Sequence, residues 1–215
     1  FEMCAACATE YGDPSDRRYH AQPVCCHGCG PRVELQGASG ATVHGDPYAA
    51  AAAVLRSGGT LAVKGLGGFN LAADARAEGA VARLRTLKRR DHKPLAVMVG
   101  SEAEASALVR LSPRGAEALA TSASPIVLAT VRDGAGLAPS VAPGLGRVGV
   151  MLPSTPMQHL LLAEGLGPLV MTSANTTDDP LLTEASEVLA ADLADAVLTH
   201  DRPILRAVDD SVVLD

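Results

Sequence analysis

The distribution of cysteine is the feature that most restricts how this chain can fold. All five cysteines lie in the first 29 of 215 residues, and four of them form two Cys-x2-Cys pairs 18 residues apart: Cys4 with Cys7, and Cys26 with Cys29. Two such pairs supply the four thiolates of a closed tetrahedral zinc site. A segment this short buries too little apolar surface to fold alone, so bound Zn²⁺ would supply the missing stability. The sequence therefore predicts a zinc ribbon over residues 1–36, with these four cysteines as metal ligands.

Other side chains of this segment leave alternatives open. Cys25 is surplus to a four-thiolate site, and either His20 or His27 could replace a thiolate as a ligand. Without metal, the segment would be a set of exposed thiols. Because residues 30–215 contain no cysteine, a secreted disulfide-rich protein is disfavoured. We therefore expect a local metal module in a reducing, cytoplasmic compartment.

The rest of the chain alternates strand-like and helix-like segments, which is typical of an α/β domain with one open sheet. Apolar, β-prone runs predict strands at 60–65, 70–75, 94–100, 124–130, 147–152, 168–173 and 195–200. Helices are expected from Asp46-Pro47 to Gly58, over 80–90, over 101–110, from Ser112-Pro113, over 155–163 and over 183–193, and 33–45 is expected to be a hairpin or linker. In the helix at 80–90, an apolar face of Val81, Leu84 and Leu87 places Arg85 and Arg89 on the opposite, solvent face.

Composition excludes several classes of protein. With 47% hydrophobic and 20% charged residues, the chain can build a core and is not expected to be disordered. No apolar run approaches the roughly 20 residues that a membrane-spanning helix requires. A net charge of −6 argues against a general nucleic-acid binder, which usually presents a broad basic face.

One segment reverses this acidic character. Residues 83–93 carry six cations and one acid, whereas the other 204 residues carry 12 cations and 23 acids. A basic helix C-terminus that satisfies its own dipole explains one or two of these cations, but not the whole excess. The chain has only three lysines, Lys64, Lys88 and Lys93, and a compact ammonium suits phosphate oxygens, to which Arg90 can add a planar fork. The segment therefore predicts an anionic ligand.

A glycine-rich run follows the strand that ends at Lys64. Its glycines, Gly65, Gly67 and Gly68, would let backbone amides approach a ligand closely. Taken alone, the run is more typical of a tight turn than of a ligand-binding loop, since it is neither a Walker A loop nor a GxGxxG match.

Small polar residues follow the apolar run at 168–171. Ser173 and Asn175 stand where an open α/β sheet commonly binds its ligand, although an Asn/Ser turn that caps a helix has the same composition. Taken together, the three polar clusters predict a pocket for a nucleotide triphosphate held without a P-loop.

These clusters resemble the motifs of the YrdC-like family of adenylate-forming domains. The pattern K-x-R, then P-L and a later S-x-N, matches Lys88-Arg89-Arg90, Pro94-Leu95 and Ser173-Ala174-Asn175. KGLGGFNLAADA stands where the family usually has a motif close to PTxTxYGL. This version resembles the YrdC-like domain of the HypF family, the carbamoyltransferases of [NiFe]-hydrogenase maturation. The finger segment EYGDPSDRRYHAQPVCCHGCGPR and the runs KRRDHKPLAVM, VGVMLPSTPMQHLLL, HDRPI and DDSVV extend the similarity over the whole chain.

The resemblance implies a fold, a reaction and partners. It implies an open, twisted mixed sheet with helices over residues 37–215, forming a YrdC-like nucleotide-binding domain that follows the zinc ribbon. In that family such a domain joins carbamate, derived from carbamoyl phosphate, to ATP with Mg²⁺, and gives carbamoyl-adenylate and pyrophosphate. A further domain transfers the carbamoyl group to HypE. Because the chain starts at Phe1 and lacks the family's acylphosphatase, first-finger and transferase segments, we expect it to be part of a longer protein.

The resemblance also implies roles for single residues. Lys88, Arg90 and Lys64 are the expected catalytic residues, with Lys88 and Arg90 on the phosphates and Lys64 facing carbamate. Ser173 and Asn175 would orient the triphosphate. The remaining expected contacts to substrate come from Gly65, Gly67, Gly68, Lys93 and Arg206, and Arg202 is a further candidate.

Three other functions remain open at this point. A threonylcarbamoyl-adenylate synthase for tRNA modification has a related domain, but the zinc module and the KGLGGF version of the first motif argue against it. An antibiotic O-carbamoyltransferase has a similar adenylating domain and is expected to lack this finger. A non-enzymatic RNA-binding module is disfavoured because aromatic residues, which would stack on bases, make up only 2% of the chain.

Overall fold

The computed structural model describes residues 2–90, 92–176 and 179–215. It divides into two compact units. The first, the finger unit, comprises Phe1–Val33 and His200–Pro203, and the second, the sheet unit, comprises Glu34–Thr199 and Ile204–Asp215. The predicted domain limits, 1–36 and 37–215, stay a prediction.

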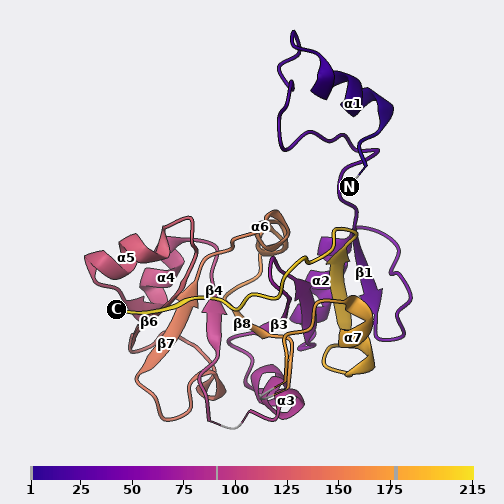
Figure 1. Cartoon of the computed structure of the whole chain (residues 1–215). Coiled ribbons are helices and arrows are strands. Elements are labelled where there is room, and N and C mark those ends of the chain that lie inside the picture. Colours follow the sequence, from indigo (N-terminus) through magenta and orange to yellow (C-terminus); the bar gives the residue numbers. More distant parts are fainter. Residues whose placement is uncertain (1, 91, 177–178) are drawn as a thin grey trace. The chain divides into compact units, whose positions relative to one another are not determined.

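The sheet unit is an α/β domain in which the ten strands of the described residues form one sheet (Figure 1). The strands are β1 (Val33–Gly37), β2 (Leu61–Lys64), β3 (Phe69–Asp74), β4 (Ala96–Met98), β5 (Val109–Arg110), β6 (Ile126–Val131), β7 (Arg147–Met151), β8 (Leu169–Ser173), β9 (Ala196–His200) and β10 (Val212–Leu214). The helices are α1 (Ala5–Gly12) of the finger unit and α2 (Pro47–Arg56), α3 (Glu78–Lys88), α4 (Glu102–Leu108), α5 (Pro113–Leu119), α6 (Pro156–Ala163) and α7 (Ala185–Ala190), with a 3₁₀ turn η1 (Pro139–Val141).

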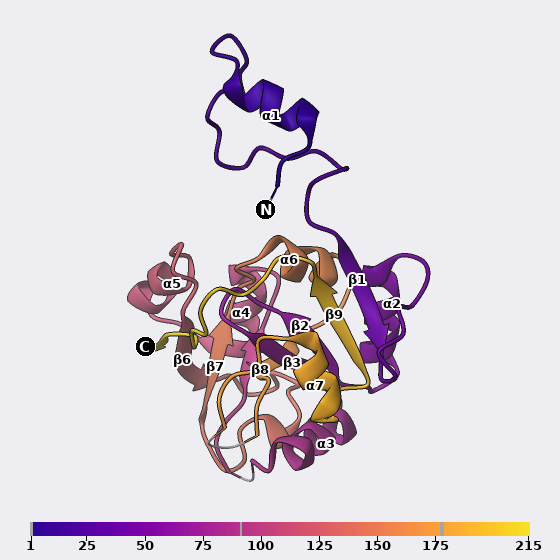
Figure 2. The ribbon, with the colours of Figure 1, turned by 45° about the vertical axis from the view of Figure 1, so that its right-hand side comes forward.

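The sheet is open and mixed, as the sequence predicts. Its strand order is β1-β9-β2-β3-β8-β4-β7-β6-β10, and β5 pairs with β6 beside this path. The pairs β2–β9, β4–β7 and β6–β10 are parallel, whereas β2–β3, β3–β8, β4–β8 and β6–β7 are antiparallel. In both views α4 and α5 lie beside β6 and β7 (Figures 1 and 2).

Local sequence signals set several element ends. The Asp46 side chain accepts hydrogen bonds from the Tyr48 and Ala49 amides at 2.8 and 2.9 Å, with Pro47 in the first turn, so α2 starts where the sequence predicts. Thr155 and Gln158 form a capping box at α6. The expected hairpin at 33–45 is present as β1 and an isolated antiparallel bridge between Gln36 and Thr42.

Other element ends were predicted wrongly. The helix expected to reach Arg110 ends at Leu108, because the β-branched Val109 is buried and pairs with Val131 as part of β5. Helix α7 is shorter than 183–193, and α3 starts and ends two residues earlier than 80–90. Strand β10 was not predicted from the sequence, and all three of its residues are exposed.

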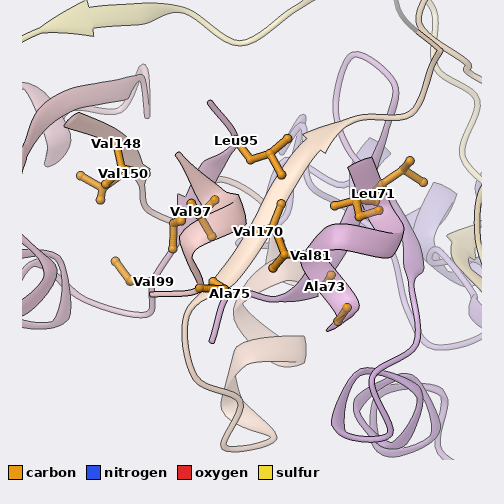
Figure 3. Close-up of a cluster of buried hydrophobic side chains, with 14 of the residues drawn as sticks. Leu71, Ala73, Ala75, Val81, Leu95, Val97, Val99, Val148, Val150 and Val170 are labelled. Carbon is orange, nitrogen blue, oxygen red and sulfur yellow. The ribbon is translucent and has the colours of Figure 1, made fainter. Parts of the chain in front are cut away.

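Alternate residues along the central strands face opposite sides of the sheet. The main core lies on one face, where Leu71 and Ala73 of β3, Val97 of β4, Val150 of β7 and Val170 of β8 gather with Val81 of α3 (Figure 3). The intervening residues, such as Ala96, Gly149 and Met171, point to the other face. That second face carries the cavities described below.

One prediction about α3 was wrong. Val81 and Leu84 are fully buried as expected, but Arg85 is also buried, at 7% exposure, rather than facing solvent. Its guanidinium donates to main-chain carbonyl oxygens, which compensates for the loss of water. A helical-face pattern cannot distinguish this arrangement from a solvated arginine.

In the described part of the chain, none of the helices has both the length and the apolar character that crossing a membrane demands.

Candidate functional site

Two adjacent cavities open at the end of β8, within the sheet unit. Their volumes are about 270 and 300 Å³, and they share Ser173, Asp209 and Asp210 in their walls. Ser173 is the last residue of β8, so the shared wall lies where the sequence expected a ligand-binding strand end. The segment with Asp209 and Asp210 comes from the far end of the chain and leads into β10.

The first cavity has mainly small and polar walls. The glycine-rich loop and the strand that follows it contribute Gly65, Gly67, Gly68 and Asn70. Further polar groups come from Ser122, Ser124, Ser154, Gln158 and Ser211. These serines were not predicted as site residues, since isolated serines in loops carry no signal without the fold.

The second cavity has an apolar floor and a cationic wall. Its floor consists of residues from the second face of the sheet: Ala96, Ile126, Leu128, Gly149 and Met171. Arg90 and Pro94 close one side, and Asp209 and Asp210 form the boundary with the first cavity. An apolar floor with a few charged groups at one end is the usual character of a small-molecule site.

Lys88, Ser173 and Asn175 are brought together as the sequence analysis expected. Lys88 is 1% exposed, and its Nζ donates to the Ser173 carbonyl oxygen, to the Asn175 carbonyl oxygen at 2.8 Å and to Asn175 Oδ1 at 3.1 Å. Ser173 Oγ donates to the same Asn175 Oδ1 at 2.8 Å. Burial, with a smaller contribution from the charge of Arg90, lowers the pKa of Lys88 to about 8. The ammonium thus fixes the loop after β8.

Arg90 presents a donor that the protein does not use. Its Nη2 donates to the Pro94 carbonyl oxygen at 2.9 Å, while its buried Nε has no hydrogen-bond partner among the described residues. Burial lowers the pKa of this guanidinium, which nevertheless stays charged at neutral pH. Because an unsatisfied buried donor is costly, a charged wall of this kind favours an anionic ligand.

Lys64, expected to face carbamate, lines neither cavity. It is 5% exposed, and its Nζ is 6.0 Å from the centroid of the Phe69 ring, the residue with which it pairs across β2 and β3. The Gly65 amide donates to the Gly68 carbonyl oxygen at 2.8 Å, so it is used within the loop.

The glycines permit other parts of the chain to pack closely on this loop. A Cβ at Gly67 would overlap the main-chain oxygen and nitrogen of Val208, whose amide donates to the Gly67 oxygen at 3.1 Å. A Cβ at Gly68 would overlap the Leu181 side chain. The glycines therefore let Leu181 and Val208 form walls of the first cavity.

This packing makes a prediction for Gly67→Ala. Because the clash is with main chain, which cannot rotate away, we expect the free energy of unfolding to fall by about 1–3 kcal/mol. Gly146→Ala is the matched control, since a Cβ there meets nothing within 4 Å. Urea denaturation of both variants measures the difference, and equal stability of the two would contradict the close approach of Val208.

The remaining expected contacts do not line these cavities. Lys93 and Arg206 are exposed and belong to neither wall. Arg202 belongs to the finger unit, where its Nη2 donates to the Cys29 carbonyl oxygen at 2.8 Å. Asp209 and Asp210 were not among the expected site residues, although they belong to DDSVV, one of the runs that carry the resemblance.

The finger unit brings its four paired cysteines into one cluster. The Sγ atoms of Cys4, Cys7, Cys26 and Cys29 all lie within 4.8 Å of one another. The separations are 3.7 Å for Cys4–Cys26, 3.9 Å for Cys26–Cys29 and 3.6 Å for Cys29–Cys7. Tetrahedral zinc with bonds of about 2.3 Å requires sulfur atoms about 3.8 Å apart. The cluster therefore has the dimensions of a structural zinc site.

The local backbone also favours thiolates here. Main-chain amides lower the pKa of Cys26 and lower that of Cys29 to about 6, whereas burial raises the pKa of Cys7. The Gly28 amide donates to Cys26 Sγ at 3.3 Å. Neither histidine belongs to the ligand cluster of the described residues: the His20 ring stacks on Tyr11 and Tyr19, and His27 is exposed.

Two known family models match this chain, one over most of the sheet unit and one over the finger unit. Residues 53–214 match the family model described as Telomere recombination, Sua5_yciO_yrdC, and residues 3–36 match the HypF finger. The chain is 51% identical over 216 residues to Carbamoyltransferase HypF of Rhodobacter capsulatus. The aligned region covers 99% of this chain and 29% of that relative. The chain thus spans about 29% of the length of this curated relative.

Solved structures give the same relationship. The crystal structure of full-length HypF in the phosphate- and nucleotide-bound form matches all of this chain with a TM-score of 0.91 and 40% identity, over 28% of its own length. The structure of P. abyssi Sua5 complexed with L-threonine matches 79% of this chain and 51% of its own, with a TM-score of 0.69 and 22% identity, and so shares the fold. The chain therefore belongs to the Sua5–YciO–YrdC family, and along its whole length, finger included, it has HypF carbamoyltransferases as homologues.

Proposed function

We propose that this chain carries the adenylating step of a HypF carbamoyltransferase. In this step, carbamate derived from carbamoyl phosphate reacts with ATP and gives carbamoyl-adenylate and pyrophosphate, for later carbamoylation of HypE. The observation that carries the proposal is the pair of cavities joined at Ser173, with Lys88 buried behind this residue and the unused Arg90 Nε–H in one wall. The nucleotide-bound form of a 40% identical HypF supports a nucleotide as the ligand.

The geometry suggests where each part of the substrates would lie. The apolar floor and Arg90 of the second cavity suit a nucleotide, whose α-phosphate would lie at the shared wall near Ser173. The small, polar first cavity beside Gly67 and Gly68 suits carbamate. A carbamate oxygen then attacks the α-phosphorus, and the bond from this phosphorus to the pyrophosphate oxygen breaks, with the electron pair leaving on pyrophosphate. Positioning and positive charge perform the catalysis, since the protein forms no bond to the nucleotide.

The residues of the shared wall suit Mg²⁺. This ion prefers oxygen ligands and is commonly bound by one or two carboxylates together with substrate phosphates. Asp209 and Asp210 provide such carboxylates, and burial together with the charge of Asp209 raises the pKa of Asp210, so a cation here would relieve their repulsion. Bound there, Mg²⁺ would neutralise phosphate charge.

A direct assay tests the proposal. The protein is incubated with ATP and Mg²⁺, and with either carbamoyl phosphate plus an acylphosphatase or threonine plus bicarbonate. We expect mass spectrometry to find carbamoyl-adenylate in the first mixture only. Threonylcarbamoyl-adenylate in the second mixture would instead assign the tRNA-modification activity, and binding of RNA without any adenylate would favour the nucleic-acid function.

The lowered pKa of Lys88 predicts a dependence of ATP binding on pH. The free protein loses the ammonium charge as the pH rises through about 8, so affinity for ATP is expected to decline above this pH. Bound triphosphate favours the charged form, so binding near pH 8 should take up a proton. Calorimetry in buffers of different ionisation enthalpy measures this uptake, and a buffer-independent enthalpy would count against it.

The same lowered pKa affects folding stability. Between about pH 8 and 10.5, Lys88 is protonated in the unfolded chain but neutral in the folded chain, so this group makes the free energy of unfolding increase with pH.

A further inference from the structure

Arg85 is the buried cation of α3 for which the proposed reaction has no role. Its side chain lies in the last turn of the helix and donates to four main-chain oxygens: Nε to Ser140 at 2.5 Å, Nη1 to Arg90 at 2.8 Å, and Nη2 to Lys93 at 3.1 Å and to Val141 at 3.2 Å. A guanidinium has five N–H donors in a rigid fork, so it can fix several carbonyl groups at once. Arg85 therefore joins the segment after α3 to η1.

The backbone of Arg85 holds the same segment from the other side. Arg89 adopts a left-handed conformation with φ +52°, the Arg89 amide donates to the Thr86 oxygen at 3.1 Å, and the Arg90 amide donates to the Arg85 oxygen at 3.0 Å. This pattern is a Schellman motif built on a residue other than glycine. Residue 90 is thus bound to Arg85 at both its amide and its carbonyl group.

These contacts connect Arg85 with the second cavity. Arg90 lines this cavity, and its Nη2 donates to the Pro94 oxygen, so the directions of peptides 90 and 94 determine where the guanidinium points. The neighbouring Leu95 amide donates at 2.9 Å to the Val141 oxygen, which also accepts from Arg85. Glu78 anchors η1 as well, because its carboxylate accepts from the Ser140 amide at 3.1 Å.

We propose that Arg85 is a positioning residue that aims Arg90 into the second cavity. The proposal rests on the proposed function, in which Arg90 contacts the phosphates. Arg85 touches no substrate, and its effect on the reaction passes through the Arg90 peptide. A displacement of about 1 Å in such a group can lower a rate by about 10²-fold.

A double-mutant cycle tests this dependence. ATP–pyrophosphate exchange is measured for Arg85→Gln, Arg90→Gln and the double variant, with Arg83→Gln as the matched control. Arg83 is an exposed arginine of the same helix that pairs with Asp195. We expect Arg85→Gln to lower kcat/KM for ATP by about 10- to 100-fold, and the double variant to be no worse than Arg90→Gln within about twofold. Losses that multiply would overturn the proposal, because Arg85 would then act independently of Arg90.

A second measurement does not depend on catalysis. Amide hydrogen exchange of the chain without nucleotide compares Arg85→Gln and Arg85→Lys with the unaltered chain. We expect protection of the Arg90 and Leu95 amides to fall at least about tenfold in both variants, because lysine cannot satisfy four carbonyl groups. Protection in the strand β3 should not change. Unaltered protection at Arg90 and Leu95 would overturn the proposal, even if the adenylation assay itself fails.

Discussion

Lys88→Met is expected to lower ATP–pyrophosphate exchange by about 10²- to 10³-fold. The buried ammonium donates to the Ser173 and Asn175 carbonyl oxygens and to Asn175 Oδ1. Methionine has a similar length but no donor, so each of the three acceptors loses a hydrogen bond, although the Ser173 carbonyl oxygen keeps the Asn175 amide and Asn175 Oδ1 keeps Ser173 Oγ. The substitution also removes positive charge from behind the proposed α-phosphate site. Both losses act on the pyrophosphate that leaves, since the charge that develops there would no longer be compensated.

The controls separate catalysis from folding. Arg83→Met removes a cation from the exposed side of the same helix and should leave exchange unchanged. Melting temperatures identify any variant that is merely unstable, because each unsatisfied buried acceptor costs about 1–3 kcal/mol. An unchanged rate of exchange in a folded Lys88→Met protein would remove Lys88 from the mechanism.

Removal of zinc is expected to unfold the finger unit and leave the sheet unit folded. Among the described residues of the finger unit, only Cys7 and Val24 are buried hydrophobic side chains. So small a core cannot compensate for the conformational entropy of about 30 ordered residues, whereas four thiolates on Zn²⁺ contribute about 10–16 kcal/mol. We expect one zinc ion per chain, and a chelator should abolish amide protection at Ala8 and Gly30 but not in β3 or β8.

Substitutions distinguish the ligands from the neighbouring thiol. Cys26→Ser should lose zinc, because it removes one corner of the tetrahedron. Cys25→Ser is the matched control, since Cys25 lies outside the four-cysteine cluster and the variant should retain one equivalent of metal. Substitution of Co²⁺ for zinc reports the ligand set through its thiolate charge-transfer bands. Full metal retention by Cys26→Ser would show that the cluster does not act as a four-thiolate site.

The sequence determined the local parts of this protein. Short apolar, β-prone runs predicted β2, β3, β6, β7, β8 and β9, because strands covered on both faces, such as β2, β8 and β9, have almost continuous apolar sequences. Caps such as Asp46 and Thr155 fixed helix starts through hydrogen bonds that lie within four residues. The spacing of the four cysteines was sufficient to group them, because each Cys-x2-Cys pair is a local turn.

Only the tertiary structure decided what the charged residues do. Arg85 and Arg89 are four residues apart and of one residue type, yet Arg85 is buried on four carbonyl groups that come from two separate parts of the chain, the segment after α3 and η1. Asp209 and Asp210 enter the site because β10 pairs with β6, more than 80 residues away in sequence. Gly67 is required by the approach of Val208, which no local pattern encodes. Burial and charge neighbours are long-range properties, so the roles of these residues follow from the fold and not from their position in the sequence.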